Sequence, residues 1–302
     1  MPASPPFFVL TDLADNFTIG TGLLDSLPGG LLALAGNDTV IGSNQADIVN
    51  GNQGNDRLIL GKGNDIIFGG QGNDTIAGEQ DQDFFSGDIG NDILYGGSIN
   101  NQLPDLADTI YGGEGNDSIF GQDGNDFLNG NQDNDYLVGG AGNDSIRGGK
   151  GSDVLLGEQG LDTLIGDNDQ DALSGGVAET GTTEVDVFVL RGDTGANALS
   201  QADLILDFSA GDKIGITNFT GGIGSLVLQE ILPVSVTDFI NQLSPELRAA
   251  QQSGLIDLND FAVDGLIQGT AISLTANGSF LGVVLNQGIV QVNAALFNTS
   301  EA

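Results

Sequence analysis

An aspartate recurs every nine residues through the middle of this chain, in two runs separated by one longer interval. Two positions after each aspartate stands an aliphatic residue or Phe, and four positions after stands Gly, except at Leu60. A fixed period of this length predicts stacked repeats, each contacting its neighbours, instead of a single globular core. The aspartates are Asp38, Asp47, Asp56, Asp65, Asp74, Asp83 and Asp92 in the first run, and Asp108, Asp117, Asp126, Asp135, Asp144, Asp153, Asp162 and Asp171 in the second.

The repeat unit is clearest in residues 69–77, Gly-Gly-Gln-Gly-Asn-Asp-Thr-Ile-Ala. Its glycine-rich half is typical of a tight turn, because glycine adopts backbone conformations that side chains forbid. Its Thr-Ile-Ala half predicts a very short strand whose central residue points inward. Two such units make one coil of eighteen residues, and successive coils pair as parallel strands about 4.8 Å apart.

Aspartates eighteen residues apart therefore stack in two columns along opposite edges of the coils. Like charges about 5 Å apart repel by roughly 3 kcal/mol per pair at an effective dielectric constant near 20, so the columns need neutralising. A divalent ion between neighbouring carboxylates, with turn carbonyls completing the shell, converts this repulsion into coordination and couples folding to metal binding. At most 13 such sites fit between the fifteen aspartates. The glycines that we expect to contribute are Gly54, Gly63, Gly72, Gly115, Gly124, Gly142 and Gly151.

The interval from Asp92 to Asp108 holds seven extra residues, mostly within residues 98–105. If they form a loop that leaves one turn, both columns continue without loss of register. The glycine two positions before the aspartate is replaced at Gln45, Asp81, Leu106, Asp133 and Asp169. Of these sites the one at Leu106 is expected to be the poorest, because leucine offers only its carbonyl oxygen.

The composition restricts the metal and the partners. The chain has 42 acidic residues against 7 basic ones, which disfavours a nucleic-acid partner because phosphate repels this charge. It has neither Cys nor His, so its only metal ligands are oxygens, which suit Ca²⁺ or Mg²⁺ and not zinc or copper. No apolar run is long enough to cross a bilayer, and the N-terminus lacks the basic region of a cleaved signal peptide.

The flanks of the repeats differ from each other. Residues 1–35 keep traces of the spacing at Asp15-Asn-Phe17 and Asp25-Ser-Leu27, and we expect them to be degenerate coils that cap the stack. Residues 177–302 predict a mixed, mostly β domain with strands at 185–190, 202–208, 271–275 and 281–285. They also predict a helix over 237–252, with a start signal at Ser244-Pro245-Glu246 and a stop at Gly254.

Two similarities to known families follow from these residues. The Gly-Gly-x-Gly-x-Asp-x-apolar-x unit of residues 36–176 resembles the nonapeptide of the RTX (repeat-in-toxin, hemolysin-type) proteins. Residues 186–190 and 205–214 resemble the segment that follows the repeats in serralysin-type proteases. The first resemblance implies an all-β fold with minor α, a right-handed parallel β-roll that folds on Ca²⁺ outside the cell, and type I secretion by an uncleaved C-terminal signal. Residues 294–302 are compatible with such a signal.

The function expected from these features is that of a secreted or cell-surface bacterial calcium-binding protein with a structural or matrix role, and not an enzyme. Its partners would be Ca²⁺, a type I exporter and a cell surface, glycan or matrix. No His-based zinc motif or Gly-x-Ser-x-Gly elbow is present, and structural roles are expected for the Asn that precedes Asp in most repeats and for Asp207 and Asp212. A hydrolase or lyase using carboxylates of residues 177–302, or an adhesin binding through its acidic face or residues 98–107, are the alternatives.

Overall fold

The computed structural model describes residues 7–24, 27, 30–99, 105–176, 184–191, 202–208, 212–217, 226–235, 241, 243–253, 266–274, 280–285 and 296–298. The chain forms two compact units, residues 1–144 and residues 145–302. This boundary lies within the repeats, so the division expected after residues 35 and 176 stays a prediction.

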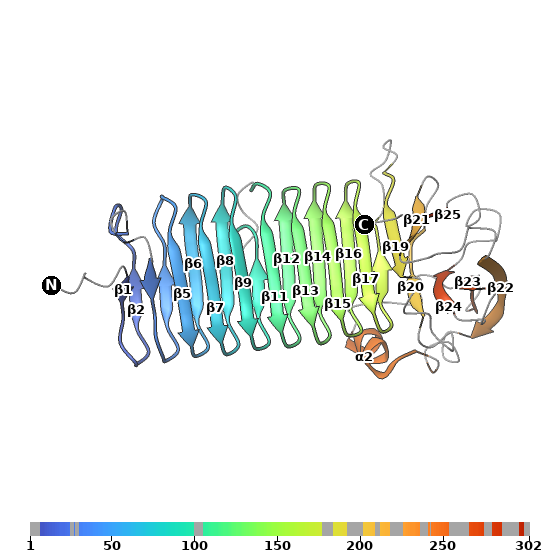
Figure 1. Cartoon of the computed structure of the whole chain (residues 1–302), viewed down its shortest axis with the longest axis horizontal. Coiled ribbons are helices and arrows are strands. Elements are labelled where there is room, and N and C mark those ends of the chain that lie inside the picture. Colours follow the sequence, from blue (N-terminus) through green and yellow to red (C-terminus); the bar gives the residue numbers. More distant parts are fainter. Residues whose placement is uncertain are drawn as a thin grey trace. The chain divides into compact units, whose positions relative to one another are not determined.

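The first unit consists of two parallel β-sheets whose strands alternate along the chain, so that odd-numbered strands form one sheet and even-numbered strands the other (Figure 1). The strands of the two sheets point in opposite directions, because the chain turns back between them. The strands are β1 (Phe8–Val9), β2 (Asn16–Thr18), β3 (Leu31–Leu32), β4 (Thr39–Ile41), β5 (Ile48–Gln53), β6 (Arg57–Lys62), β7 (Ile66–Gln71), β8 (Thr75–Gln80), β9 (Phe84–Ile89), β10 (Ile93–Tyr95), β11 (Thr109–Glu114), β12 (Ser118–Asp123), β13 (Phe127–Gln132) and β14 (Tyr136–Ala141).

The register confirms the eighteen-residue coil. Ile48 of β5 pairs with Ile66 of β7, and the other regular coils of this unit repeat that offset. Phe84 of β9 pairs with Thr109 of β11, so the pairing is in register after the seven extra residues. The prediction that the insertion passes without loss of register is therefore confirmed.

The strands are longer than the sequence indicates. Most have six residues, because Gly70 and Gln71, expected in the turn, continue the pairing of β7 with β5. Gly70 has a φ of 109°, which bends the strand without ending its hydrogen bonds. The turn is thus confined to the few residues immediately before each aspartate.

The core is a column of single side chains between the two sheets. Every residue two positions after a repeat aspartate has an exposed fraction of 0%, as the sequence predicts. Each contributes about 1.5–3 kcal/mol by leaving water. The residues are Val40, Val49, Leu58, Ile67, Ile76, Phe85, Leu94, Ile110, Ile119, Leu128, Leu137, Ile146, Leu155, Leu164 and Leu173.

The outer faces of the first unit carry ladders of aromatic residues across neighbouring strands. On the odd-numbered sheet the ring of Phe84 lies 6.2 Å from that of Phe68 and 5.8 Å from that of Tyr111. Cross-strand pairs of this kind stabilise a sheet.

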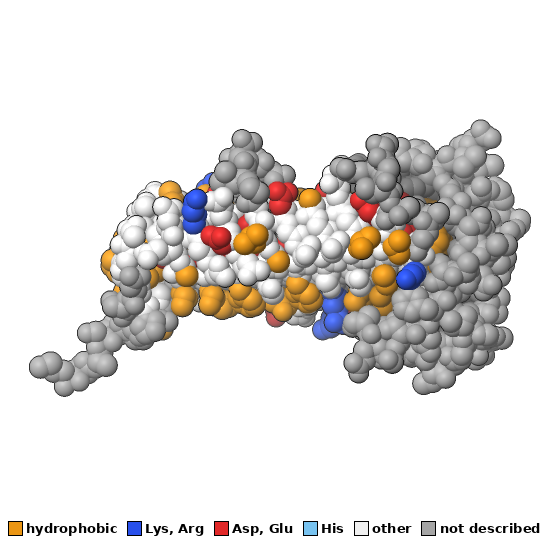
Figure 2. All heavy atoms as spheres, turned by 90° about the horizontal axis from the view of Figure 1, so that it is seen from above, with side chains coloured by type: hydrophobic (Ala, Val, Ile, Leu, Met, Phe, Trp, Pro, Cys, Tyr) orange, Lys and Arg blue, Asp and Glu red, His pale blue; other side chains and the backbone are white. Residues whose placement is uncertain are grey.

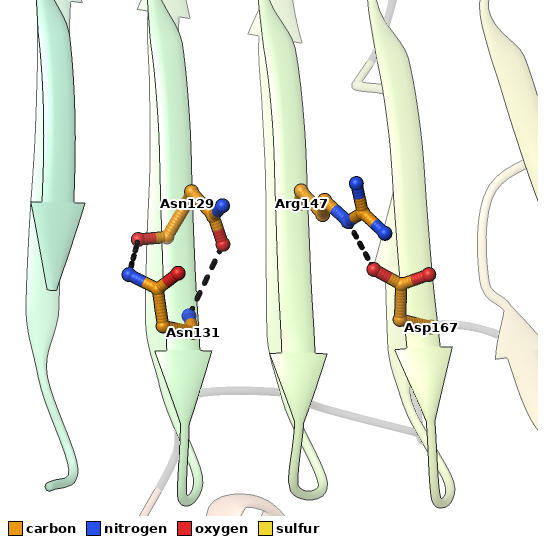
Figure 3. Close-up of polar contacts among 4 residues, drawn as sticks. All are labelled: Asn129, Asn131, Arg147 and Asp167. Atoms are coloured by element: carbon orange, nitrogen blue, oxygen red, sulfur yellow. Dashed lines mark hydrogen bonds and ion pairs between the residues drawn. The ribbon is translucent and has the colours of Figure 1, made fainter. Parts of the chain in front are cut away.

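A local hydrogen bond supports an unusual backbone conformation within β13. Asn131 has a φ of 78° and donates its N–H to Oδ1 of Asn129 over 3.1 Å (Figure 3).

In the second unit the strands first alternate between two parallel sheets, and later strands then pair antiparallel. Its sheets have the orders β15-β17-β19-β21-β25 and β16-β18-β20-β24-β23-β22, and β22, β23 and β24 pair antiparallel. An ion pair joins Arg147 of β15 to Asp167 of β17 (Figure 3). The elements are β15 (Ser145–Lys150), β16 (Val154–Gln159), β17 (Thr163–Asn168), β18 (Ala172–Ser174), β19 (Val187–Arg191), β20 (Asp203–Ile205), β21 (Lys213–Thr217), β22 (Leu226–Ser235), α2 (Pro245–Ser253), β23 (Leu266–Leu274), β24 (Phe280–Leu285) and β25 (Leu296–Asn298).

The helix begins later than the sequence indicates. Asn241, Leu243 and Ser244 lie outside α2, which begins at Pro245. Proline disfavours helical backbone in the residue before it, and Ser244 Oγ accepts the N–H of Leu247 over 3.2 Å as an N-cap. The start signal is confirmed and the span from residue 237 is wrong for the described residues 241, 243 and 244. No helix in the described part of the chain is long and apolar enough to cross a membrane.

Residues before the repeats form imperfect coils, as expected. The strands β1 and β2 pair parallel with β3 and β4. The N–H of Asp15 donates to Oδ1 of Asp38 over 2.7 Å, so this first echo of the period joins a repeat column. The second echo at Asp25, the helix stop at Gly254 and the tail residues 294–295 and 299–302 lie outside the described residues.

Candidate metal centre

Each repeat aspartate stands directly before a strand, so that consecutive coils place these residues one above another. In the first unit the backbone N–H of each aspartate donates to Oδ1 of the aspartate one coil later, over 2.7–2.8 Å. Because the two sheets run in opposite directions, the two columns lie at opposite edges (Figure 1). One column contains Asp38, Asp56, Asp74, Asp92, Asp117 and Asp135, and the other contains Asp47, Asp65, Asp83, Asp108, Asp126 and Asp144.

The second unit contains the remaining repeat aspartates and three that the sequence analysis missed. The N–H of Asp153 donates to Asp171 over 2.9 Å, and that of Asp171 to Asp203 over 3.2 Å. The N–H of Asp162 donates to Asp186 over 3.0 Å, and that of Asp186 to Asp212 over 3.0 Å.

Asp186 and Asp203 were not singled out, and Asp212 was expected to have a structural role only, because separations of 24, 32 and 26 residues, respectively, from their partners obscure the period. The signal that could have found them is the apolar residue two positions later. It is Phe188, Ile205 and Ile214, respectively.

The columns are buried within the protein. Every repeat aspartate has an exposed fraction of at most 4%, and few acidic side chains are seen over the described strands in Figure 2. For most aspartates of the first unit the second carboxylate oxygen, Oδ2, is enclosed and has no hydrogen-bond donor among the residues that the structure describes. This holds for Asp38, Asp56, Asp65, Asp74, Asp83, Asp92, Asp108, Asp117 and Asp126.

Glycines four positions after an aspartate enclose these oxygens. A β-carbon on Gly69 would contact Oδ2 of Asp74 and would lie 2.7 Å from the carbonyl oxygen of Gly87. The same pair of oxygens, one from a carboxylate and one from a glycine carbonyl, surrounds Gly51, Gly78 and Gly112. The site therefore includes the carbonyls of this glycine series, which the sequence analysis noted as constant and did not assign to the metal.

The glycines that were assigned, two positions before the aspartate, have a conformational role in the structure. Gly54, Gly63, Gly72, Gly115, Gly124, Gly142 and Gly151 all have φ between 106° and 152°. They also face the main chain of the preceding coil, as Gly72 faces Gly54, which leaves no space for a side chain. Their assignment as metal ligands stays a prediction.

Where the glycine is replaced, the turn survives. Asp81, Asp133 and Asp169 adopt φ of 70–79°, and Oδ2 of Asp81 accepts the N–H of Gly63 over 3.1 Å. The side chain of Leu106 is 51% exposed, and its carbonyl oxygen still faces Gly124 of the next coil.

One aspartate differs from its neighbours. Oδ2 of Asp47 accepts the N–H of Ser43 over 2.8 Å, so it is already engaged at the start of its column. In the next coil Leu60, fully buried, replaces the enclosing glycine before Asp65. The beginning of this column is thus the part least suited to bind an ion.

Burial dominates the electrostatics of the columns. Burial first, and then the charges of neighbouring aspartates, raise the pKa of Asp56 and Asp74 to about 7, of Asp65 to about 8 and of Asp108 to about 9. The backbone N–H bonded to each carboxylate lowers its pKa, but by less than burial raises it. At neutral pH these carboxyls therefore need either a proton or a cation.

The other polar residues of the turns have structural roles, as expected. Oδ1 of Asn55 accepts the N–H of Asn73, and Oδ1 of Asn73 accepts that of Asn91, each over 2.9 Å. Asp207 accepts bonds from Ser174 Oγ and from the N–H groups of Gly175 and Gly176. These hydrogen bonds link successive turns.

The donor set decides which metal fits. Among the described residues, no three Asp or Glu side chains gather into a preformed metal cluster, so a site must combine carboxylates with backbone carbonyls. All the ligands available in the columns are oxygens, and enclosed Oδ2 atoms without donors lie beside glycine carbonyls. Hard cations that accept many oxygen ligands, such as Ca²⁺, fit this arrangement.

Comparison with protein families also indicates calcium binding. The model of the RTX calcium-binding nonapeptide repeat (4 copies) matches residues 32–67, 68–103, 105–137, 129–164 and 148–177. Residues 32–177 therefore carry RTX calcium-binding nonapeptide repeats. None of the curated proteins matches the chain. The RTX repeats thus coincide with the two aspartate columns, and the β-roll expected from the resemblance is observed as two parallel sheets of repeated strands.

Proposed function

We propose that this protein is a secreted or cell-surface bacterial calcium-binding RTX protein with a structural or matrix role, and that it folds when it binds Ca²⁺ outside the cell. The observation that carries the proposal is the buried column of carboxylates whose Oδ2 atoms have no donor, as at Asp56, Asp74 and Asp92. A buried acceptor without a partner costs about 1–3 kcal/mol, and more when charged, so a repeated array of them requires a ligand.

Calcium bound between coils would neutralise the carboxylates and link neighbouring turns. Oδ2 of Asp74 and the carbonyl of Gly87 are representative ligands, since both flank the same glycine. The backbone orients each carboxylate before an ion binds. The N–H of the aspartate one coil earlier donates to Oδ1, and Oδ2 then points to the enclosed side. Since these ligands come from different coils, metal binding and coil stacking are one process.

Export is the part of the proposal that rests on the family. The resemblance to RTX proteins implies export of the unfolded chain through a type I exporter. An acidic chain that folds only with Ca²⁺ suits such a route. The C-terminal signal, expected in residues 294–302, would act before folding. A glycan, matrix or cell surface is the partner class that this location implies.

The catalytic alternative has less support. In the described C-terminal segments Asp186, Asp203, Asp207 and Asp212 each accept a hydrogen bond from a backbone N–H group. Carboxylates so engaged serve the stack better than they serve a hydrolase or lyase. The adhesin alternative shares the proposed location and differs only in partner.

Calcium titration of the chelated, full-length protein at pH 8, followed by circular dichroism, tests the proposal. We expect little regular structure without Ca²⁺, a cooperative gain of β-signal on its addition, and a much weaker response to Mg²⁺. A chelated protein that already shows the full β-signal at this pH would refute coupled folding. Absence of the protein from the medium of cells that carry a matching exporter would refute secretion.

A further inference from the structure

The seven-residue insertion brings an additional carboxylate back to the stack. The pairing of Ile93 with Ser118 and of Phe84 with Thr109 shows that the coils on either side stay in register. Asp105 lies at the returning end of the insertion, three positions before the column residue Asp108. Glu114 and Asp123 hold the same place before Asp117 and Asp126, so it is the surroundings of Asp105 that distinguish it.

Two side-chain oxygens without donors meet beside the insertion. A β-carbon on Gly97 would lie 2.8 Å from Oδ2 of Asp105 and 2.9 Å from Oε1 of Gln122, so both oxygens face the same point. Both atoms are buried and neither has a hydrogen-bond donor among the described residues. Two enclosed acceptors directed to one point lack the cation or donor that would satisfy them.

The orientation of both side chains is fixed by their other atoms. Oδ1 of Asp105 accepts the N–H of Leu106 over 2.9 Å. Nε2 of Gln122 donates to the carbonyl oxygen of Ser98 over 3.0 Å, which leaves the amide oxygen as its inward end. The insertion itself thus holds Gln122 in place.

Equivalent glycines in regular coils have no such neighbours. The three atoms nearest to a β-carbon on Gly70, Gly113 or Gly140 are main-chain atoms of Asn52, Asp88 and Gln122, respectively. The pair of side-chain oxygens is therefore a feature of the insertion and not of the repeat.

A column carboxylate completes the cluster. Asp108 is 2% exposed, and its Oδ2 has no donor among the described residues. A β-carbon on Gly96 would lie 2.5 Å from Oδ2 of Asp108, so this oxygen lies beside the glycine that adjoins Gly97. Two carboxylates and an amide oxygen around adjacent glycines, all of them acceptors, form a set that a divalent cation satisfies.

We propose that Asp105, Gln122 and Asp108 form a calcium site that the insertion adds to the two columns. This inference rests on the proposed calcium binding, since the same class of ion would occupy it. Its ligands differ from those of a column site, because Asp105 belongs to the insertion and Gln122 contributes an amide side chain.

The test is the number of calcium ions bound per chain, measured by equilibrium dialysis of the full-length protein at graded free calcium followed by elemental analysis. Asp105→Asn should lose one ion at saturation while its circular dichroism with Ca²⁺ stays that of the wild type. Gln122→Asn should weaken the same ion, because Asn tolerates the left-handed φ of 77° at this position but is one methylene shorter. Asp12→Asn, the same change at an exposed position, should bind as many ions as the wild type.

The outcomes separate this inference from the proposed function. A wild type that binds no calcium refutes the proposed function. A wild type that binds calcium while Asp105→Asn keeps every ion with unchanged affinity refutes the insertion site alone. If Asp105→Asn fails to fold, Gln122→Asn decides, since it leaves all carboxylates in place, and unchanged binding by that variant overturns the proposal.

Discussion

The backbone N–H of Asp56 donates a hydrogen bond of 2.7 Å to Oδ1 of Asp74, the aspartate of the next coil. This bond fixes the position of Oδ1 of each carboxylate and leaves Oδ2 enclosed. The asparagine ladder of the same turns runs in the opposite sense, since the N–H of Asn73 donates back to Asn55. Each turn is therefore held from both sides before any ion is considered.

The stability of the calcium-free protein should fall as the pH rises. The pKa of Asp56 and Asp74 is raised to about 7 and that of Asp65 to about 8, so between about pH 4 and 8 the folded state binds more protons than the unfolded state. This stabilisation is fully present below the unfolded pKa and is lost as the pH rises through the folded values. Circular dichroism of chelated protein should show β-structure near pH 4.5 that disappears by pH 8, and the reverse order would contradict the buried columns.

Gly69→Ala should destabilise the calcium-bound protein by about 1–3 kcal/mol, the usual effect of overpacking. The new β-carbon would contact Oδ2 of Asp74 and lie 2.7 Å from the carbonyl oxygen of Gly87. Thermal unfolding in saturating Ca²⁺ measures the loss. Gly20→Ala is the matched control, because nothing lies within 4 Å of its β-carbon, and equal effects of both substitutions would argue against the enclosed site.

Asp74→Asn should shift the calcium midpoint of folding to higher concentration and reduce the number of ions bound. The amide can still accept the N–H of Asp56, but it lacks the charge that attracts the ion. Titration with Ca²⁺ followed by circular dichroism gives the midpoint. Asn73→Ala in the neighbouring ladder should cost only about 1 kcal/mol or less, because the N–H of Asn91 lies at an exposed turn that water can reach. A larger calcium shift for this variant than for Asp74→Asn would be inconsistent with metal binding by the column.

Ile119→Ala should cost about 2–5 kcal/mol, since this side chain is fully buried between the sheets. Chemical denaturation in saturating Ca²⁺ measures the change in the free energy of unfolding. Leu13→Ala, at a position 73% exposed, should change it by less than about 0.5 kcal/mol. A small effect at Ile119 would mean that the single central side chain of each coil is not its core.

Much of the fold could be predicted because the repeat makes long-range contacts periodic. Asp74 and Asp92 are one coil apart, and so are Asp56 and Asp74, so a single inference about the coil positions every aspartate. The inward direction of residues such as Ile67 follows from the alternation of a strand. The insertion could be assigned to a loop because the spacing is the same on both sides of it.

Contacts outside the period could not be predicted in this way. Asp203 joins Asp171 across 32 residues and Asp212 joins Asp186 across 26, because chain segments of irregular length return to the same edge. The start of α2 follows a local rule, the effect of Pro245 on the residue before it, which is visible in the sequence as the start signal at Ser244-Pro245-Glu246.

The sequence by itself determined the coil length, the inward residue of each strand and the all-oxygen chemistry of the columns, because these depend only on period and residue type. The tertiary structure alone decided which oxygen of each carboxylate is bonded, which glycine carbonyl faces it, and that Asp105 meets Gln122. The physical reason is that these contacts join atoms of different coils, whose approach is fixed by the packing of the coils and not by the spacing of residues along the chain.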